Sequence, residues 1–426
     1  MSEAGAWGLF QRFGVELEYM IVGRGMAVLA AADELLRRQA GRCVSDVVRG
    51  PITWSNELVA HVIELKNTEP VRRLEPLVEL FAAEVPHING LLQPLDARLL
   101  PTAMHPWMDP ARETRLWPHG GGEVYQAYDR IFDCRGHGWS NLQSVHLNLP
   151  FASDDEFGRL HAAVRLVLPI LPALAASSPL ADGRPSGLLD TRLDYYRTNS
   201  IKIPSVAGRV IPEAVFTRER YEQEILQPMY AEIAPHDPQG ILRDEFLNAR
   251  GAIARFSRGT IEIRLLDVQE CPLADLAVCA AVAAALEGLV GERWAPLAVQ
   301  SAWPVEPLER ILLKCTRDAE RAVIDDPAYL ACLGLKSERC LAGQIWRHLL
   351  DDLSPVSTKS VDPGRWRRAW QILVEEGPLA RRILESLEGV DWPDPPAARH
   401  RLMEVYGELA GCLAENRMYT LAGRGD

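Results

Sequence analysis

Residues 13–22, which read FGVELEYMIV, place two glutamates two positions apart inside an apolar run. Side chains of a β-strand alternate between its two faces, so this segment predicts a strand that is apolar on one side. Glu16 and Glu18 then share the other side. Because like charges repel, this pair needs either full solvation or a cation between the two carboxylates.

Three further segments predict strands of the same kind, each apolar on one face. The predicted strands are 14–22, 58–66, 142–150 and 259–268, and their polar faces carry Glu16 and Glu18, Glu64 and Lys66, Ser144, His146 and Asn148, and Glu262 and Arg264. One such strand is typical of an antiparallel sheet with a solvated side. Four strands biased towards carboxylates, with one imidazole and one guanidinium, favour a shared face that binds a hard cation. Carboxylates and a single imidazole suit Mg²⁺ or Mn²⁺.

The order of predicted elements changes near residue 300. Before that point the strands alternate with helices predicted over 26–40, 71–84, 153–176, 216–228 and 273–290. From about residue 305 the pattern is helical, with proline-containing breaks near 303–307, 355–363 and 393–396. We therefore expect a catalytic part over residues 1–300 and a helical extension over 301–426. The extension is expected to act as a cap or an oligomerisation surface, with Trp346, Trp366 and Trp370 in core packing.

Charge and composition exclude several classes of partner. The net charge of −12 argues against a nucleic-acid ligand. The N-terminus lacks a basic region followed by a long apolar run, and the Ala-rich segment 277–290 is better explained as a core helix than as a membrane span. Eight scattered cysteines without metal-binding spacing indicate reduced thiols. We expect a cytoplasmic protein that acts on small molecules, without a membrane partner, and that could form a homo-oligomer.

Three of the predicted strands resemble the metal-binding strands of the glutamate–cysteine ligases, in the bacterial carboxylate–amine ligase or family 2 branch. They are GVELEY, SVHLNLP and GTIEIRLLDV. LPALAASSPLADG (171–183) and DTRLDYYRTN (190–199) are similar to a Ser-Ser-Pro segment and a substrate-side motif of the same branch. The resemblance covers about residues 12–290. It implies an α+β, glutamine synthetase-like catalytic fold, with a curved, mostly antiparallel sheet of about six strands flanked by helices.

The resemblance also assigns roles to individual residues. It implies one metal site from Glu16, His146 and Glu262, and another from Glu18 and Glu64, with Glu57 as a third candidate. Glu57 lies seven residues before Glu64, so it needs a turn or bulge to reach the same face. Roles are further implied for Arg264 and Glu262 in catalysis, for Arg264, Lys66 and Asn148 in binding ATP, and for Arg192, Tyr196 and Asn199 in binding substrate. Arg192 could instead be a surface arginine that stabilises a turn.

The implied activity is ATP-dependent amide-bond formation with Mg²⁺ or Mn²⁺. A carboxylate, by resemblance the γ-carboxyl of glutamate, would be activated as an acyl phosphate and then joined to an amine. Asn148 stands where the branch has a second histidine, which leaves the amine open. Two alternatives remain: a catalytically inactive protein that binds ATP or metal, and a phosphagen-type kinase.

Overall fold

The protein is built around an eight-stranded antiparallel sheet with strand order β2-β3-β4-β1-β6-β10-β9. β4 pairs with one edge of β1, while β6 and β5 pair with the start and the end of its other edge. The computed structural model describes residues 7–120, 122–353 and 360–421. The strands of the sheet are β1 Gly14–Val22, β2 Asp46–Arg49, β3 Ile52–Asn56, β4 Val62–Asn67, β5 Arg98–Leu100, β6 Ser144–Pro150, β9 Ala252–Arg255 and β10 Thr260–Asp267.

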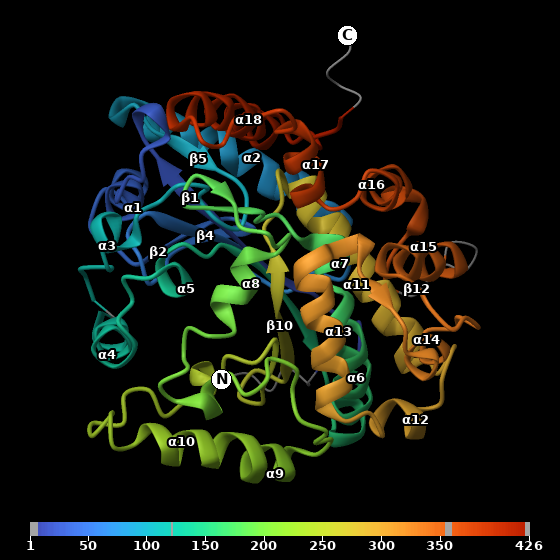
Figure 1. Cartoon of the computed structure of the whole chain (residues 1–426). Helices are drawn as coiled ribbons and strands as arrows, with labels where there is room; N and C mark the ends of the chain where they lie inside the picture. Colours follow the sequence, from blue (N-terminus) through green and yellow to red (C-terminus); the bar gives the residue numbers. More distant parts are fainter. Residues whose placement is uncertain (1–6, 121, 354–359, 422–426) are drawn as a thin grey trace.

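The predicted α+β class and the antiparallel sheet are confirmed, and all four predicted strands are present as β1, β4, β6 and β10. β1, β4 and β10 are labelled in Figure 1. β4 begins later than predicted, at Val62, because residues 57–61 form a turn after β3. The sheet has more strands than the six expected. β2, β3, β5 and β9 are each only 3 to 5 residues long, which is too short for alternation to reveal them.

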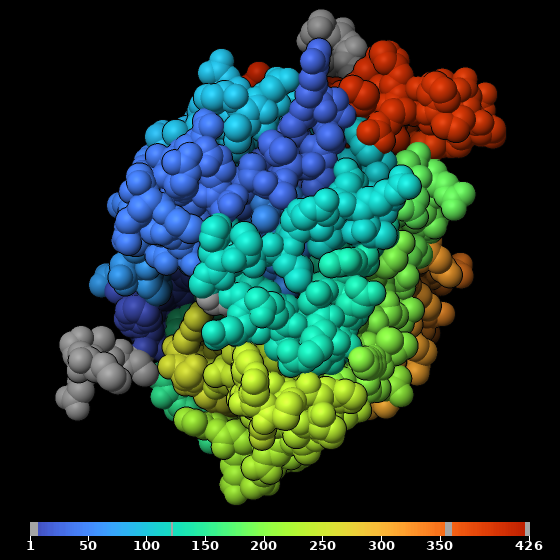
Figure 2. Space-filling model, turned by 90° about the vertical axis from the view of Figure 1, so that its left-hand side faces the viewer, coloured from blue at the N-terminus to red at the C-terminus, as the bar shows by residue number. Residues whose placement is uncertain are grey.

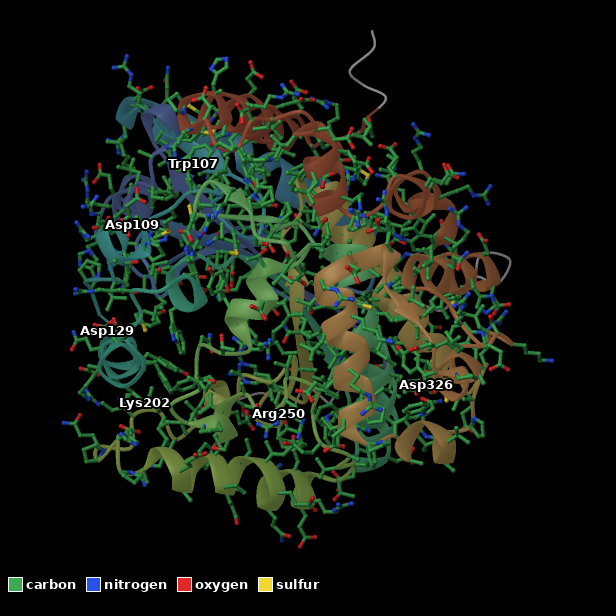
Figure 3. All side chains as sticks on the ribbon, viewed as in Figure 1. Trp107, Asp109, Asp129, Lys202, Arg250 and Asp326 are labelled. Carbon is green, nitrogen blue, oxygen red and sulfur yellow. The ribbon has the colours of Figure 1, made fainter. Side chains whose placement is uncertain are left out.

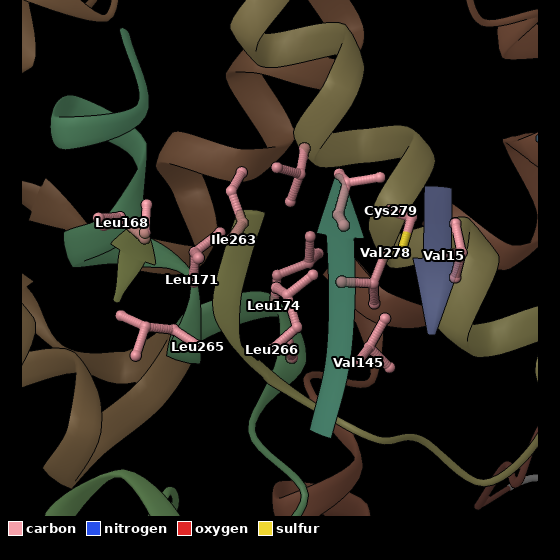
Figure 4. Close-up of a cluster of buried hydrophobic side chains, with 14 of the residues drawn as sticks. Val15, Val145, Leu168, Leu171, Leu174, Ile263, Leu265, Leu266, Val278 and Cys279 are labelled. Atoms are coloured by element: carbon pink, nitrogen blue, oxygen red, sulfur yellow. The ribbon is translucent and has the colours of Figure 1, made fainter. Parts of the chain in front are cut away.

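The apolar face of the sheet forms the main hydrophobic core. Val15, Val145 and Ile263, one from each of three neighbouring strands, lie in one buried cluster with Leu174 and Val278 from the helical layer (Figure 4). That layer contains α2 Glu75–Leu92, α6 Asp154–Val167, η3 Leu168–Ile170, α7 Pro172–Ala175 and α11 Pro272–Val290. The helix predicted over 153–176 is thus interrupted, because Pro169 and Pro172 cannot donate the backbone bonds of a continuous helix.

α11 is the central helix of this layer and is apolar on all sides. Its length and composition would allow it to cross a membrane, but 83% of its most apolar window is buried inside the protein. It packs against α2 and α6 and against two helices of the C-terminal region. A helix that is hydrophobic all round and surrounded by other helices is a core helix, as predicted.

The C-terminal helices share this core and do not form a separate one. They are α12 Leu297–Ser301, α13 Val305–Asp318, α14 Pro327–Cys332, α15 Ala342–Leu353, α16 Pro363–Glu375, α17 Leu379–Ser386 and α18 Pro395–Glu415. Trp346 donates a hydrogen bond to the carbonyl of Ile170, at 2.7 Å, and Trp370 to that of Ala277, at 2.8 Å. Trp346, Trp366 and Trp370 are buried, which confirms their predicted place in the core. The main cluster runs through residue 300 without a break, and the division there stays a prediction. Of the break predicted near 355–363, residues 354–359 lie outside the described part of the chain.

The polar face of the sheet is covered by short helices and loops. These and the remaining elements are η1 Arg24–Met26, α1 Ala32–Ala40, η2 Gln93–Leu95, α3 Pro110–Glu113, α4 Gly122–Phe132, α5 His137–Ser140, the hairpin β7 Leu180–Ala181 and β8 Arg184–Pro185, α8 Thr191–Tyr196, η4 Pro204–Val206, α9 Arg218–Tyr221, η5 Glu222–Leu226, α10 Gln227–Ile233, η6 Glu245–Leu247, η7 Ala319–Arg321, and the hairpin β11 Val323–Ile324 and β12 Cys340–Leu341. Lys202, labelled in Figure 3, donates to the carbonyl of Ile131 at 2.7 Å and ties the loop after α8 to α4. Arg250 forms a two-point ion pair with Glu213, at 2.6 and 2.7 Å. These contacts hold the covering layer over the sheet.

Candidate active site

The polar side chains of the sheet lie in rows across neighbouring strands. Glu18 of β1 stands directly opposite Glu64 of β4, which stands opposite Ser55 of β3. In the next row Glu16 lies between Lys66 and His146, and in a third Asn148 faces Glu262. The register of β1 with its two neighbours therefore brings together groups that are far apart in sequence.

The first acidic group combines Glu18, Glu57 and Glu64, whose ligand atoms all lie within 4.8 Å of one another. Glu57 follows the last residue of β3 and sits in the turn to β4, which is the turn that its position required. Glu18 is held by Ser144, whose backbone N–H and hydroxyl donate to Oε2 at 2.7 and 3.0 Å. The three carboxylates predicted for this site are therefore adjacent.

The second group combines Glu16, Glu64 and His146, again with ligand atoms within 4.8 Å. The sequence predicted Glu262 in this group, and in the described residues Glu262 belongs to neither group. It instead forms ion pairs with Arg255 and Arg264, each at 3.0 Å. The strand pattern placed Glu262 and Arg264 on one face of β10, but it did not reveal Arg255 of β9 as the second partner of Glu262.

Opposite and like charges shift the pKa values of these groups in different directions. Burial raises the pKa of Glu16, but the hydrogen bond and charge of His146 together with the charge of Lys66 lower it to about 2. For His146, burial lowers the pKa, but the hydrogen bond and charge of Glu16 and the charge of Glu18 outweigh burial, so the pKa is raised overall. Burial first, and neighbouring carboxylates second, raise the pKa values of Glu57 and Glu64. The site therefore holds carboxylates that resist ionising together.

This donor set fits a divalent cation. It offers carboxylate oxygens and one imidazole, which Mg²⁺ and Mn²⁺ accept as ligands. A divalent charge among Glu18, Glu57 and Glu64 would remove the repulsion that raises the pKa values of Glu57 and Glu64. Because Glu64 belongs to both groups, its carboxylate would contribute to holding a divalent cation in either of them.

Arg264 lies at an irregularity of β10. The pairing with β6 shifts register between Ile263 and Leu266, and such bulges turn a side chain away from the regular pleat. The guanidinium donates to the carbonyl of Asn248 at 3.2 Å and pairs with Glu262, while the side chain lines the cavity described below. Arg264 therefore presents a fixed positive charge next to the acidic groups.

Arg192 is buried, not a surface arginine. Only 2% of its side chain is exposed, and it pairs with the buried Asp267 at 3.3 Å. Its two terminal nitrogens also donate to the carbonyls of Leu265 and Arg264, at 3.4 and 3.0 Å. Of the guanidinium nitrogens, Nε has no hydrogen-bond partner within the part of the chain that the structure describes. The alternative that Arg192 stabilises an exposed turn is therefore wrong.

The Ser-Ser-Pro segment has a structural explanation in the same place. The backbone N–H of Ser177 and the hydroxyl of Ser178 both donate to Asp267 Oδ2 at 2.8 Å. The hydroxyl of Ser178 also accepts from the N–H of Arg192 at 3.1 Å. The segment thus fixes the carboxylate that in turn orients Arg192.

A cavity of about 580 Å³ lies between the sheet and its covering layer, and both acidic groups line it. The predicted residues Lys66, Arg192, Tyr196, Asn199, Glu262 and Arg264 line it as well. Asn148 does not line this cavity. It lines a smaller hollow of about 270 Å³, which shares Glu16, Lys66 and Arg258 with the cavity.

The sequence did not reveal the aromatic part of the cavity lining, which reaches the acidic groups where Tyr125 accepts a hydrogen bond from Asn56, next to Glu57. Tyr125 and Tyr128 of α4 and Trp139 of α5 form this part. Figure 2 shows the segment that carries α4 and α5, in cyan, next to the segment around η6 and β9, in yellow. The sequence does show two tyrosines three positions apart on one amphipathic helix. This spacing is also common in ordinary core packing, so it does not by itself predict a ligand-binding surface.

The sequence pattern of glutamate–cysteine ligase family 2 (GCS2) matches residues 12–399. The chain belongs to this family. The resemblance seen in its strands is thereby confirmed, and the GCS2 match extends beyond residue 290 into the C-terminal helices. Membership places the protein among ligases of the glutamate–cysteine ligase type.

Two relatives illustrate the range of the family. An uncharacterized protein of Archaeoglobus fulgidus is 32% identical over 409 residues, which cover 95% of this chain and 99% of that protein. A protein of Bordetella petrii, provisionally named glutamate–cysteine ligase 2, is 28% identical over 281 residues, which cover 63% of this chain and 60% of that protein.

Solved structures of distant ligases share the fold seen here. Glutamate–cysteine ligase of Francisella tularensis, in complex with AMP, matches with a TM-score of 0.56 at 13% identity, over 98% of this chain and 97% of that one. A bifunctional glutathione synthetase of Pasteurella multocida matches with a TM-score of 0.59 at 13% identity, over 94% of this chain and 53% of that one. At this identity the likeness is one of fold.

Proposed function

We propose that the protein is an ATP-dependent carboxylate–amine ligase that activates the γ-carboxyl of glutamate and joins it to an amine. The observation that carries the proposal is the pair of acidic groups that share Glu64 on one wall of the cavity. The carboxylates on this wall repel the phosphates of a nucleoside triphosphate unless divalent cations lie between carboxylates and phosphates. The groups have the donor atoms that Mg²⁺ or Mn²⁺ requires.

When bound, the divalent cation would neutralise the negative charge of the phosphates. The chain would supply further positive charge through Arg264 and Lys66, which both line the cavity. We assign Arg264 to the transferred phosphoryl group, because its ion pair with Glu262 holds the guanidinium in place before substrate arrives. Lys66 stands opposite Glu16 and its ammonium pairs with Glu64 at 2.6 Å, and Asn148 donates to Glu16 at 3.2 Å. We assign both residues to the rest of the phosphate chain.

Three unpartnered polar atoms support the substrate-binding role of the α8 segment. Arg192 Nε, the hydroxyl of Tyr196 and Oδ1 of Asn199 are buried, and none has a hydrogen-bond partner among the described residues. All three residues line the cavity. Buried polar atoms are almost always hydrogen-bonded in proteins, so these atoms are candidates to bind the carboxylate and ammonium groups of glutamate.

The proposed reaction needs no nucleophilic side chain. An oxygen of the substrate carboxylate attacks the γ-phosphorus, and ADP leaves. The amine nitrogen then attacks the acyl carbon, the bond from that carbon to the phosphate oxygen breaks, and inorganic phosphate leaves. The amine gives up a proton to solvent. The main task of the protein is to bring anions together, which is an electrostatic task.

The test is phosphate release with Mg²⁺, ATP, glutamate and a panel of amines. We expect release that depends on both glutamate and an amine, and a loss of turnover of about a hundredfold or more in Glu64→Gln. Glu69→Gln is the matched control, because Glu69 is exposed just after the same strand. A stable phosphorylated product without amide would indicate a kinase, and nucleotide binding without turnover would indicate an inactive binding protein.

We also propose a cytoplasmic location. All eight cysteines are free, and six of them are buried, which suits a reducing compartment. Substrates of this enzyme would be small molecules, and a homo-oligomer remains a proposal that a sedimentation measurement would test.

A further inference from the structure

The side chain of Asn199 is held in one orientation by α5. Its Nδ2 donates to the carbonyl of Gly138 at 2.7 Å, and the indole nitrogen of Trp139 donates to the backbone carbonyl of Asn199 at 3.0 Å. If the amide of Asn199 were turned over, its oxygen would face the carbonyl oxygen of Gly138, and two acceptors repel each other. The contact with α5 therefore decides which end of the amide is left free.

The free end is the oxygen Oδ1. It is buried, Asn199 lines the cavity, and no group in the described ranges 7–120, 122–353 and 360–421 donates a hydrogen bond to it. A carboxamide oxygen can only accept, so its partner on a ligand must be an N–H or O–H donor. A carboxylate or phosphate oxygen at this position would meet another acceptor and gain no hydrogen bond.

The other two unpartnered atoms of the α8 segment have different requirements. Arg192 Nε can only donate, so it requires an acceptor such as a carboxylate, whereas the hydroxyl of Tyr196 can donate or accept. An ammonium group is therefore excluded from Arg192 Nε and is suited to Asn199 Oδ1. A carboxylate has the opposite preference.

Net charge does not decide what binds along this segment, because charges of both signs act on Tyr196. Burial above all raises the pKa of Tyr196, and the charges of Arg264 and Arg192 lower this pKa. The charges of Glu262 and Glu18 raise it. Each of the two guanidinium groups already pairs with a carboxylate, at 3.0 and 3.3 Å. An ammonium group is thus not barred by these cations, and the hydrogen-bonding pattern sets the specificity.

We propose that Asn199 is the specificity-determining residue that selects an acid substrate with a free ammonium group, and that Trp139 is a positioning residue for Asn199. This inference rests on the proposed ligase function and assigns the ammonium group of glutamate to Asn199 Oδ1. An acid of the same length without the ammonium group leaves this buried oxygen unsatisfied, which is costly.

Glutarate tests this inference, because it has the two carboxylates of glutamate and no ammonium group. We would measure the KM for glutamate and the inhibition constant of glutarate as a competitor of glutamate, with Mg²⁺-ATP and a saturating amine. Asn199→Leu, which keeps the shape of the side chain, should raise the KM for glutamate about tenfold and change the inhibition constant of glutarate less than about twofold. An unchanged KM, or equal weakening of glutamate and glutarate, overturns the inference and leaves the ligase function intact. Absence of turnover by the wild type with every amine contradicts both.

A second substitution tests the role of Trp139. Trp139→Phe keeps a ring in contact with Tyr128, whose centroid lies 5.3 Å away, and removes the indole N–H. The KM for glutamate should rise about fivefold, with the inhibition constant of glutarate and the KM for ATP unchanged. Trp294→Phe is the matched control, because its indole nitrogen also donates one hydrogen bond, to Asp352 at 2.9 Å, and Trp294 does not line the cavity.

The pattern of Michaelis constants separates positioning from other roles of Trp139. A rise in the KM for ATP or for the amine, with an unchanged KM for glutamate, would show that Trp139 serves another substrate and would overturn its assignment. Circular dichroism and thermal unfolding of the three variants would show that the fold is retained.

Discussion

A buried ion pair connects residues 268–271, between β10 and α11, to the C-terminal helices. Arg382 of α17 and Glu270 are both fully buried, and Arg382 Nη1 donates to Glu270 Oε1 at 2.7 Å. The same nitrogen donates to the carbonyl of Tyr419, and the N–H of Tyr419 donates to Glu270 at 3.0 Å. Glu270 lies three residues after Asp267, the partner of Arg192. The pair therefore links the C-terminal helices to the substrate side of the cavity.

Replacing Arg382 by methionine should destabilise the protein strongly. The change leaves the carboxylate of Glu270 buried without its cation, and removing one partner of a buried pair costs about 3–5 kcal/mol. The double variant Arg382→Met with Glu270→Gln should recover much of this loss, because no charge then remains buried. Arg401→Met, which breaks an exposed ion pair with Glu404 on α18, should change stability little.

Urea unfolding followed by tryptophan fluorescence gives the free energies for this double-mutant cycle. Catalytic turnover at a temperature where all variants remain folded shows whether the pair also supports the active site. A loss of less than about 1 kcal/mol in Arg382→Met would refute the reasoning. So would a double variant whose loss equals the sum of the two single losses.

Three further predictions concern single residues. Arg264→Lys should lower kcat about a hundredfold in a phosphate-release assay, because a lysine cannot reproduce the two-point contact of a guanidinium; unchanged kcat would exclude Arg264 from phosphoryl transfer. Burial above all raises the pKa of Asp275 to about 8, and this carboxyl lies 2.9 Å from the hydroxyl of Tyr19. Between about pH 4 and 8 the folded state therefore keeps a proton on Asp275 that the unfolded state has already released. The free energy of unfolding should fall as the pH rises through this range, by up to about 1.4 kcal/mol per pH unit. Asp275→Asn should flatten that dependence in urea unfolding at pH 5 to 8, and an unchanged slope would contradict the assignment. Gly138→Ala should impair turnover more than stability, because the added Cβ would lie 2.8 Å from Cβ of Asn199 at the cavity; wild-type kinetics would show that this approach does not matter.

The sequence predicted the long strands because their side chains alternate over enough positions. β1 and β6 each expose one apolar and one polar series, and the face of every polar residue follows from its position alone. The same rule does not give distances between strands. Glu262 was therefore placed with Glu16 and His146, whereas the register of β10 against β6 sets it beside Asn148 and its two arginines.

Other parts of the site depend on tertiary packing that no local pattern encodes. Arg192 is followed by charged and polar residues that suggest a surface loop, yet Asp267 draws it into the interior. The short strands β2 and β5 exist because β3 and β1 provide an edge for them. Likewise, Tyr125 and Trp139 lie on separate short helices, and only the fold of the covering layer turns them towards one cavity.

The central claim is that the carboxylates on this sheet face hold divalent cations. Titration of Mn²⁺ into the nucleotide-free protein, followed by electron paramagnetic resonance, measures this without reference to turnover. Binding is expected in the wild type and in Glu69→Gln, with affinity at least about tenfold weaker in Glu64→Gln, because Glu64 serves both groups. Equal affinity in Glu64→Gln, or no binding by the wild type, would contradict the account.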